Sequence, residues 1–324
     1  MYIEPDEETI SHFLKKQQIK SERNELLEFM KGKKTISKDN KEMRLFSRIL
    51  SPDDLDEAIE NDAEGFCICS NSYYDKGKWG EITEELLYNF YQSFIQKVPG
   101  QKVIIWACEL GILSDQNACE NKVEDNPAMG YHSIRAYLDN SDLLKMQIRA
   151  LLRSTVDAQI GILFPMIISI EEIRQIKVIL EEVQNELQVE GIPYAPFEIG
   201  IGIETPAAVM ISDLLAEEVD FFSICGDELT QYTLAADRVN PSLEHYYNPH
   251  HLAIFRMIRM VVENAAKAGI WCEFNGEIAE NPIIVKPLMK FGVHQLCLMP
   301  SNILGMRQKI REWDIDMYIL HPLL

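Results

Sequence analysis

The stretch FEIGIGIETPAAVMISDLLAEEVDFFSIC (197–225) holds two short apolar runs separated by a longer amphipathic segment. The runs Phe197–Glu204 and Phe221–Cys225 have the length of strands, and Ala207–Glu218 has the apolar spacing of a helix. Strands that are apolar at nearly every position are typical of parallel sheets, because both faces of such a sheet are covered. The stretch therefore predicts a β–α–β unit.

The same alternation continues in both directions along the 324-residue chain, with helical periodicity again at Glu171–Val189. Eight such units favour an α/β fold of the (β/α)₈ TIM-barrel type over an open doubly wound sheet, and no GxGxxG turn follows the first strand. The functional site is then expected where the strands end. The predicted strands are Met43–Ile49, Gly65–Ser70, Lys102–Cys108, Gln159–Phe164, Phe197–Glu204, Phe221–Cys225, Trp271–Asn275 and Gln295–Met299.

The chain before the first strand has a different composition. Glu7–Met30 is polar with scattered leucines, which predicts an N-terminal helical extension that packs on something larger. KGKKTISKDNK (31–41) is a basic, turn-rich connector. We therefore predict an N-terminal arm and connector over 1–41 and the barrel over 42–324.

Charge and cysteine usage limit the partners and the compartment. A formal net charge of −20 argues against nucleic acid and anionic membranes as partners. No apolar stretch is long enough to span a membrane and no secretory signal is visible, so we expect a cytoplasmic protein. The seven cysteines lie mostly in apolar runs and are predicted to be reduced and buried. The CxC of Cys67 and Cys69 is expected to be two packed core thiols, because no second pair of metal ligands stands nearby in the sequence.

Several segments in a fixed order identify a related family. The most specific are IGIETPAA (201–208) and FFSICGDELTQYTLAADRVN (221–240), accompanied by RALLRS (149–154), LFPMIIS (163–169) and NGEIA (275–279). On these segments the chain resembles the phosphoenolpyruvate-binding barrel of enzyme I of the bacterial sugar phosphotransferase system, from roughly Asp6 to Arg311. The resemblance implies phosphoenolpyruvate or pyruvate as a small anionic ligand, Mg²⁺ as the cofactor, and a homodimer. In that family the phosphoryl group passes to a histidine on a separate domain.

The resemblance places a metal site on two carboxylates. Glu204 matches the first carboxylate that binds the metal, and Glu228 stands where the family has an aspartate. Oxygen ligands of this kind suit Mg²⁺. Arg238 matches an arginine that binds the anionic groups of the substrate. Asp227 replaces an asparagine that contacts the phosphate, and its negative charge is expected to oppose phosphate binding.

Other family positions have lost their chemistry. Arginines of the family fall on Ser70, Trp106 and His132, which removes the bidentate guanidinium contacts that bind phosphate strongly. Trp106 is expected to fill the vacated space, or alternatively to stack on a different ligand. The cysteine that exchanges a proton with the substrate methylene falls on Asn275, whose amide cannot act as a general acid or base. No catalytic residue is therefore assigned, and the predicted substrate-binding residues are Arg238, Asp227, Asn275, Ser70 and Trp106.

Alternatives remain for several of these side chains. Glu273 shares a strand face with Asn275 and is a candidate replacement base, whereas Cys272 is expected to face away from the barrel axis. Glu204 and Arg238 could instead form a structural ion pair without a ligand. His245, His250 and His251 are expected to be solvated loop residues, because their spacing places no two imidazoles on one regular face.

Three functions follow from this pattern. The first is a non-catalytic or regulatory paralogue that binds a metal or small acid and has lost phosphoryl transfer. The second is a working phosphotransferase domain that acts with a separately encoded phosphohistidine domain. The third is a divergent Mg²⁺-dependent enzyme acting on a pyruvate-like enolate. The replaced arginines would position the phosphate and stabilise its charge, and these are the main contributions to catalysis of phosphoryl transfer. The sequence therefore favours the first function.

Overall fold

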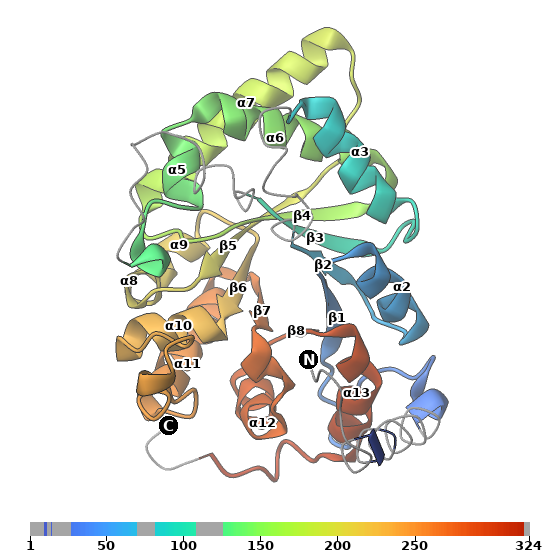
Figure 1. The fold of residues 1–324 in the computed structure, drawn as a ribbon, viewed down its shortest axis with the longest axis vertical. Helices are drawn as coiled ribbons and strands as arrows, with labels where there is room; N and C mark the ends of the chain where they lie inside the picture. Colours follow the sequence, from blue (N-terminus) through green and yellow to red (C-terminus); the bar gives the residue numbers. More distant parts are fainter. Residues whose placement is uncertain (1–9, 12–13, 15–26, 70–81, 108–125, 321–324) are drawn as a thin grey trace.

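Eight parallel strands close into a barrel in chain order, β1 to β8, with helices outside it (Figure 1). The structure is a computed structural model that describes residues 10–11, 14, 27–69, 82–107 and 126–320. The strands are β1 (Arg44–Ile49), β2 (Phe66–Ile68), β3 (Lys102–Trp106), β4 (Gln159–Phe164), β5 (Glu198–Ile203), β6 (Phe221–Cys225), β7 (Trp271–Asn275) and β8 (Gln295–Leu298). The predicted (β/α)₈ barrel is confirmed, with each predicted strand matched to within two residues at either end.

The larger helices of the outer ring have local start and stop signals. The longest, α7, begins with a capping box between Ser169 and Glu172 and ends at Gly191, whose φ of 71° suits glycine. The helices of eight or more residues are α2 (Pro52–Glu60), α3 (Glu84–Ile95), α6 (Ser141–Arg153), α7 (Ile170–Glu190), α10 (Gly226–Leu234), α11 (Leu252–Ala268), α12 (Pro282–Phe291) and α13 (Ile303–Glu312). Among the described residues, no helix is both long enough and apolar enough to cross a membrane.

Two short helices replace one predicted helical segment. The expected helix over Ala207–Glu218 is instead α8 (Pro206–Met210) and α9 (Ser212–Ala216), because the backbone leaves the helical region at Ile211, with φ −114° and ψ 17°. Thr205 caps α8 by accepting a hydrogen bond from the N–H of Ala208 at 3.2 Å. The Thr-Pro pair of IETPAA therefore starts helix α8 directly after β5.

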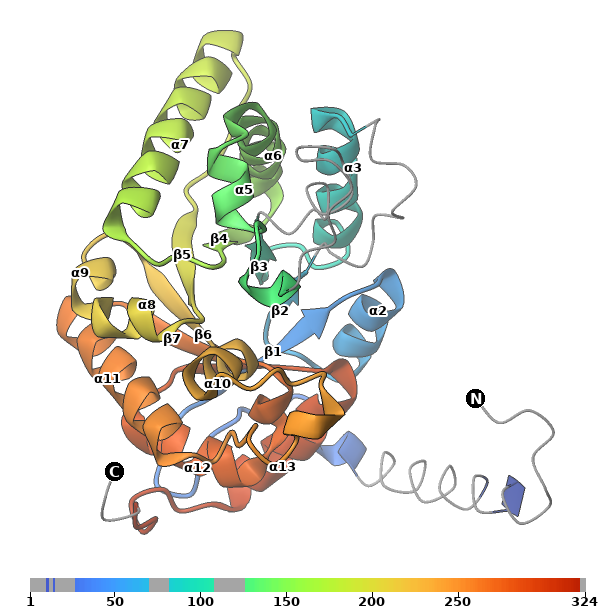
Figure 2. The same cartoon turned by 60° about the vertical axis from the view of Figure 1, so that its left-hand side comes forward.

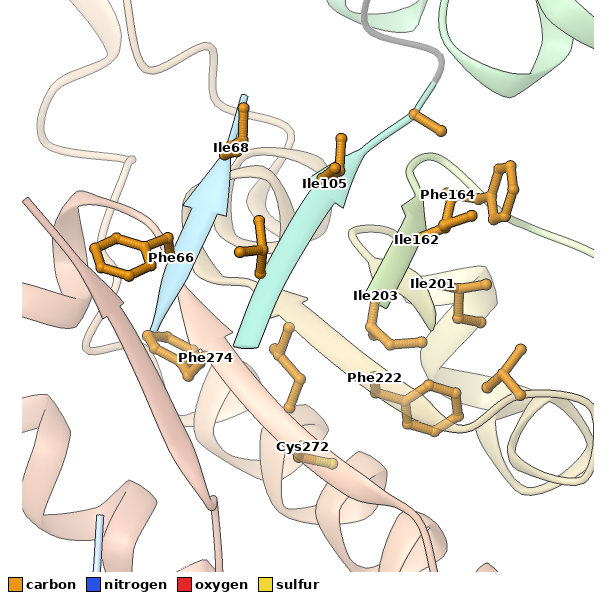
Figure 3. Close-up of a cluster of buried hydrophobic side chains, with 14 of the residues drawn as sticks. Phe66, Ile68, Ile105, Ile162, Phe164, Ile201, Ile203, Phe222, Cys272 and Phe274 are labelled. Atoms are coloured by element: carbon orange, nitrogen blue, oxygen red, sulfur yellow. The ribbon is translucent and has the colours of Figure 1, made fainter. Parts of the chain in front are cut away.

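Strand side chains alternate between two apolar layers. Those facing outward pack beneath the helices, and Figure 3 shows part of this layer, with Phe66, Phe222 and Cys272 among the labelled side chains. Those facing inward form a separate buried cluster inside the barrel, made of Phe46, Cys67, Ile104, Leu163, Phe221 and Cys297. Gly200 makes room for this cluster, since a Cβ there would lie 2.2 Å from the ring of Phe221. Cys272 faces away from the barrel axis, as predicted.

The connector is attached to the bottom of the barrel by a buried arginine. Arg307 of α13 is fully buried and contacts Asp62, Thr35 and the carbonyl of Met30. Leu27 and Met30, the latter in the 3-10 helix η1 (Glu28–Met30), pack on Leu304. Most of the predicted helical arm lies outside the described residues, and the boundary at residue 41 stays a prediction.

Candidate functional site

Glu204 stands at the end of β5 and faces the barrel interior. Its carboxylate is 5 % exposed and accepts a hydrogen bond from the backbone N–H of Met166 at 2.8 Å. Gly202 leaves the space that this conformation needs, because a Cβ there would lie 2.4 Å from Oε1 of Glu204. Burial and the nearby charge of Glu228 raise the pKa of Glu204 to about 8. A carboxylate this poorly compensated is a good ligand for a cation.

Glu228 and Arg238 form an ion pair beside Glu204. Glu228 lies in the first turn of α10, which begins directly after β6 and lies in front of the strands in Figure 2. Nη1 of Arg238 is 2.7 Å from Oε1 of Glu228. The alternative of an ion pair between Glu204 and Arg238 is therefore wrong. Arg238 pairs with Glu228, and the charge of Arg238 acts on Glu204 only at longer range. Sequence order alone could not show which of the two carboxylates pairs with Arg238, since they follow the ends of neighbouring strands, β5 and β6.

Arg135 and Tyr232 were not predicted. The positive charge of Arg135, in α5 (Ile134–Leu138), acts on both Glu204 and Tyr232. Tyr232 donates a hydrogen bond to the carbonyl of Ala128, and burial together with the two glutamates raises its pKa to about 12. Arg135 is the arginine that ends the segment GYHSIR (130–135), and its retention was the available signal.

Asp227 has a structural use at the mouth of the barrel. Its carboxylate accepts hydrogen bonds from the backbone N–H of Glu277 at 2.6 Å and from the hydroxyl of Tyr247 at 3.2 Å. Gly276, with φ 114°, allows this contact, because a Cβ there would lie 2.6 Å from Oδ2 of Asp227. Burial raises the pKa of Asp227, and the bond from Glu277 opposes that rise. Asp227 thus holds the turn after β7 in place. Its carboxyl group also lies at the mouth of the barrel, where we expect from the sequence that it opposes phosphate binding.

Asn275 faces inward at the end of β7 and is hydrogen-bonded deeper into the barrel. Its Nδ2 donates to Oγ of Ser223 at 2.6 Å and lies 3.5 Å from Sγ of Cys225, the residue paired with it on β6. Ser223 in turn donates to Glu273 at 2.7 Å. Glu273 is fully buried below Asn275, so it shares the predicted face but is separated from the mouth. This arrangement removes Glu273 as a replacement base and reveals Cys225, a thiol that the sequence argument missed.

The remaining predicted positions divide into three groups. Trp106 packs on the inward-facing cluster, as expected for a side chain that fills vacated space, and its indole N–H has no hydrogen-bond partner among the described residues. Ser70 lies outside the described residues.

His132 is bonded locally, to Ser133 and to the carbonyl of Ala128. His250 contacts the side chain of Asn281 at the start of α12, and His251 caps α11, so both side chains contact the ends of neighbouring helices.

The donor set at the mouth fits Mg²⁺. Glu204 and Glu228 are hard oxygen ligands from neighbouring strand ends, and the negative charge of Glu228 opposes ionisation of Glu204. A divalent cation would relieve that repulsion. Glu204 would hold the ion directly, and Glu228 would do so in exchange for, or together with, its contact to Arg238.

Comparison with known proteins agrees with the motifs and the fold. The family model for the phosphoenolpyruvate-binding domain of phosphoenolpyruvate-utilising enzymes matches residues 24–315. This chain belongs to that family. A phosphoenolpyruvate-protein phosphotransferase from Priestia megaterium is 34 % identical over 311 residues, covering 96 % of this chain and 54 % of the relative. One from Listeria innocua is 34 % identical over 316 residues, covering 96 % and 55 %.

The chain thus spans about half the length of the curated relatives it matches. Among solved structures, a citrate lyase from Burkholderia xenovorans superposes with a TM-score of 0.53 at 13 % identity, covering 84 % of this chain and 78 % of that one. An aldolase/citrate lyase family protein from Burkholderia cenocepacia gives 0.52 at 10 % identity, covering 89 % and 98 %. These two structures support the barrel fold of this phosphoenolpyruvate-utilising family member and nothing further.

Proposed function

We propose that this member of the phosphoenolpyruvate-utilising family binds Mg²⁺ and a small carboxylic acid at the barrel mouth and does not transfer a phosphoryl group. The composition of the mouth carries this proposal. The metal-type carboxylates Glu204 and Glu228 are in place, while an indole (Trp106) and an amide (Asn275) occupy the positions where the family has a guanidinium and a thiol.

Charge explains why a monoanion suits this site better than a phosphate ester. Asp227, Glu204 and Glu228 bring three carboxyl groups, against the guanidinium groups of Arg135 and Arg238. Bound Mg²⁺ would neutralise the two glutamates and polarise a carboxylate or carbonyl oxygen of the ligand. Arg238 would then orient the ligand carboxylate, which needs one guanidinium, whereas a phosphate ester needs several cationic partners.

The test is a calorimetric titration of the full chain with each acid in the presence of Mg²⁺. We expect pyruvate to bind with a Kd of about 1 mM, and phosphoenolpyruvate to bind no more tightly than pyruvate, because each lost charged hydrogen bond costs about 1.5–3 kcal/mol. Omitting Mg²⁺ should abolish both signals. Micromolar, Mg²⁺-dependent binding of phosphoenolpyruvate would refute the proposal and support a working phosphotransferase domain that uses a separate phosphohistidine domain.

One observation favours a second function, proton exchange on a bound pyruvate-like enolate. Cys225 places a thiol one strand away from Asn275, with its sulfur 3.5 Å from Nδ2 of Asn275. Burial and the charges of Glu204 and Glu228 raise the pKa of this thiol, so it is protonated at neutral pH. The thiol would donate this proton to the enolate carbon, and the thiolate that remains would take a proton from the methyl group of pyruvate in the reverse step.

This function predicts that Mg²⁺ and the chain exchange the methyl hydrogens of pyruvate in deuterium oxide. Cys225→Ala should then abolish the exchange, and Cys272→Ala, which removes a buried thiol facing the outer helices, should not change it. Exchange no faster than in buffer would exclude the second function and leave the binding proposal intact.

The homodimer implied by the family is also a proposal for this chain. Light scattering of the purified protein should then give twice the chain mass of 37.3 kDa. A mass of 37.3 kDa at micromolar concentration would exclude a stable dimer.

A further inference from the structure

A second group of metal-type ligands lies inside the barrel, away from the mouth. It consists of Cys67 on β2, Glu273 on β7 and Cys297 on β8, which are 0 %, 0 % and 4 % exposed. One ligand atom from each lies within 4.8 Å of the other two, and Sγ of Cys67 is 3.3 Å from Oε2 of Glu273. Three strands therefore bring two sulfurs and a carboxylate to one point in a sealed interior.

The carboxylate of Glu273 is unusual at such a depth. Its hydrogen-bond donors are neutral: the hydroxyl of Ser223, the amide of Gln295 and the thiol of Cys67. No lysine or arginine forms an ion pair with Glu273 among the described residues, and the charge of Arg44 acts on it only at longer range. Buried carboxylates are normally paired with a cation or bound to a metal, because an isolated buried charge is very costly.

Gln295 adds an independent observation. This side chain is fully buried, and its Oε1 has no hydrogen-bond partner among the described residues. Leaving a buried acceptor unpaired costs about 1–3 kcal/mol. Because Nε2 of the same amide contacts Glu273, the unpaired oxygen lies at the edge of the Cys67–Glu273–Cys297 group. An ion bound there, or a water on that ion, would give this oxygen a partner.

We propose that Cys67, Glu273 and Cys297 bind a structural Zn²⁺ ion, with Oε1 of Gln295 or a water as the fourth ligand. The chemistry selects this metal, because thiolate sulfur suits Zn²⁺ whereas Mg²⁺ and Ca²⁺ take oxygen ligands. Tetrahedral zinc, with bonds of about 2.3 Å to sulfur and about 2.0 Å to oxygen, separates its ligand atoms by roughly 3.5–3.8 Å. The three ligand atoms lie within 4.8 Å of one another, and Sγ of Cys67 is 3.3 Å from Oε2 of Glu273, close to that separation. Binding releases the thiol protons to solvent.

The surroundings supply the outer contacts that such a site needs. Ser223 donates to Oε1 of Glu273 at 2.7 Å, and Asn275 donates to Ser223 at 2.6 Å. Oε2 of Glu273 accepts from Cys67 and Gln295, and it would bind the ion once the Cys67 thiol has lost its proton. Outer contacts of this kind orient metal ligands and strengthen binding. The ion would join β2 to β7 and β8 across the barrel interior. The CxC spacing of Cys67 and Cys69 could not indicate this site, because the sulfur partner of Cys67 is Cys297, from the far end of the chain.

The test measures zinc in the purified full chain by mass spectrometry after dialysis, and repeats the measurement after refolding with Zn²⁺. We expect about one zinc per chain, at least a tenfold loss of zinc in Cys67→Ala and in Cys297→Ala, and no loss in Cys272→Ala. Glu204→Gln should also keep its zinc, which separates this site from the mouth. Zinc retained in the Cys67→Ala/Cys297→Ala double variant, or lost in Glu204→Gln, would overturn the proposal.

Cobalt provides a readout that needs no variant. Refolding the unaltered chain with Co²⁺ should give the near-ultraviolet absorption band of cobalt bound to thiolate, and added Zn²⁺ should remove it. A folded chain, checked by circular dichroism, that shows neither this band nor bound zinc would refute the site even if both cysteine variants fail to fold.

Discussion

Glu204→Gln should weaken Mg²⁺ binding by about 100-fold, or about 2.7 kcal/mol, when the two proteins are compared calorimetrically at pH 8. The amide keeps the shape of the side chain and its hydrogen bond from Met166 but removes the charged ligand. The control is Glu217→Gln, which neutralises an exposed carboxylate at the end of α9 and should leave the affinity unchanged. Equal affinities in Glu204→Gln and the unaltered chain would place Mg²⁺ elsewhere.

The same carboxylate sets the pH dependence of binding. Burial and Glu228 raise the pKa of Glu204 to about 8, so protons compete with Mg²⁺ below that pH. The affinity should fall by up to about tenfold per pH unit as the pH decreases from about 8, and this slope should be absent in Glu204→Gln. A flat pH profile in the unaltered chain would contradict the assignment.

The sign of the accompanying stability change is also fixed. A carboxyl whose pKa is raised by folding favours the folded state while it is protonated. That contribution is complete below the unfolded pKa of 4.5 and is lost as the pH rises through about 8. The metal-free chain should therefore lose stability over this window, and saturating Mg²⁺ should restore it because the ion binds only the folded state. Thermal denaturation with and without Mg²⁺ measures both effects.

Arg307→Leu should lower the free energy of unfolding by about 3–5 kcal/mol, the largest stability effect we expect from a single side chain here. Arg307 is fully buried, and its guanidinium contacts the carboxylate and the carbonyl of Asp62 at 2.6 Å each. It also donates to Thr35 at 3.1 Å and to the carbonyl of Met30 at 3.3 Å. Leucine leaves the carbonyl of Asp62 without this donor and removes the ion pair with its carboxylate, which keeps only the hydrogen bond from the N–H of Gly32. The change also detaches the connector from α13 and from the loop after α2.

Urea denaturation provides the measurement, with two comparison variants. Arg307→Lys should recover little, because an ammonium cannot reach acceptors spread around a planar guanidinium. Arg174→Leu removes an arginine whose side chain is 65 % exposed and paired with Glu218, and should cost less than about 1 kcal/mol. A loss below about 1 kcal/mol in Arg307→Leu would show that the connector is not held by this contact.

The sequence predicted the barrel because parallel strands buried on both faces have a distinct local pattern. The runs at 159–164, 221–225 and 271–275 match β4, β6 and β7 residue for residue. The interruption at Ile211 was not predictable, because apolar spacing alone does not show where a helix divides. The mouth was located from the same pattern, since strand ends define it.

The partners of side chains at the mouth were harder to predict. Arg238 pairs with Glu228 and not with Glu204, and Asp227 is turned toward the backbone of Glu277. Both outcomes depend on side-chain conformations and on loops that meet only after the barrel closes. Closure likewise brings Cys67 beside Cys297, a contact that no local spacing encodes.

The most direct test of the proposed loss of phosphate binding compares phosphoenolpyruvate binding by this chain with binding by the matching barrel of the Priestia megaterium relative, in the same buffer with Mg²⁺. We expect this chain to bind phosphoenolpyruvate at least about 100-fold more weakly, because charged contacts to the phosphate have been replaced by Trp106 and opposed by Asp227. Equal Mg²⁺-dependent affinities in the two proteins would contradict it.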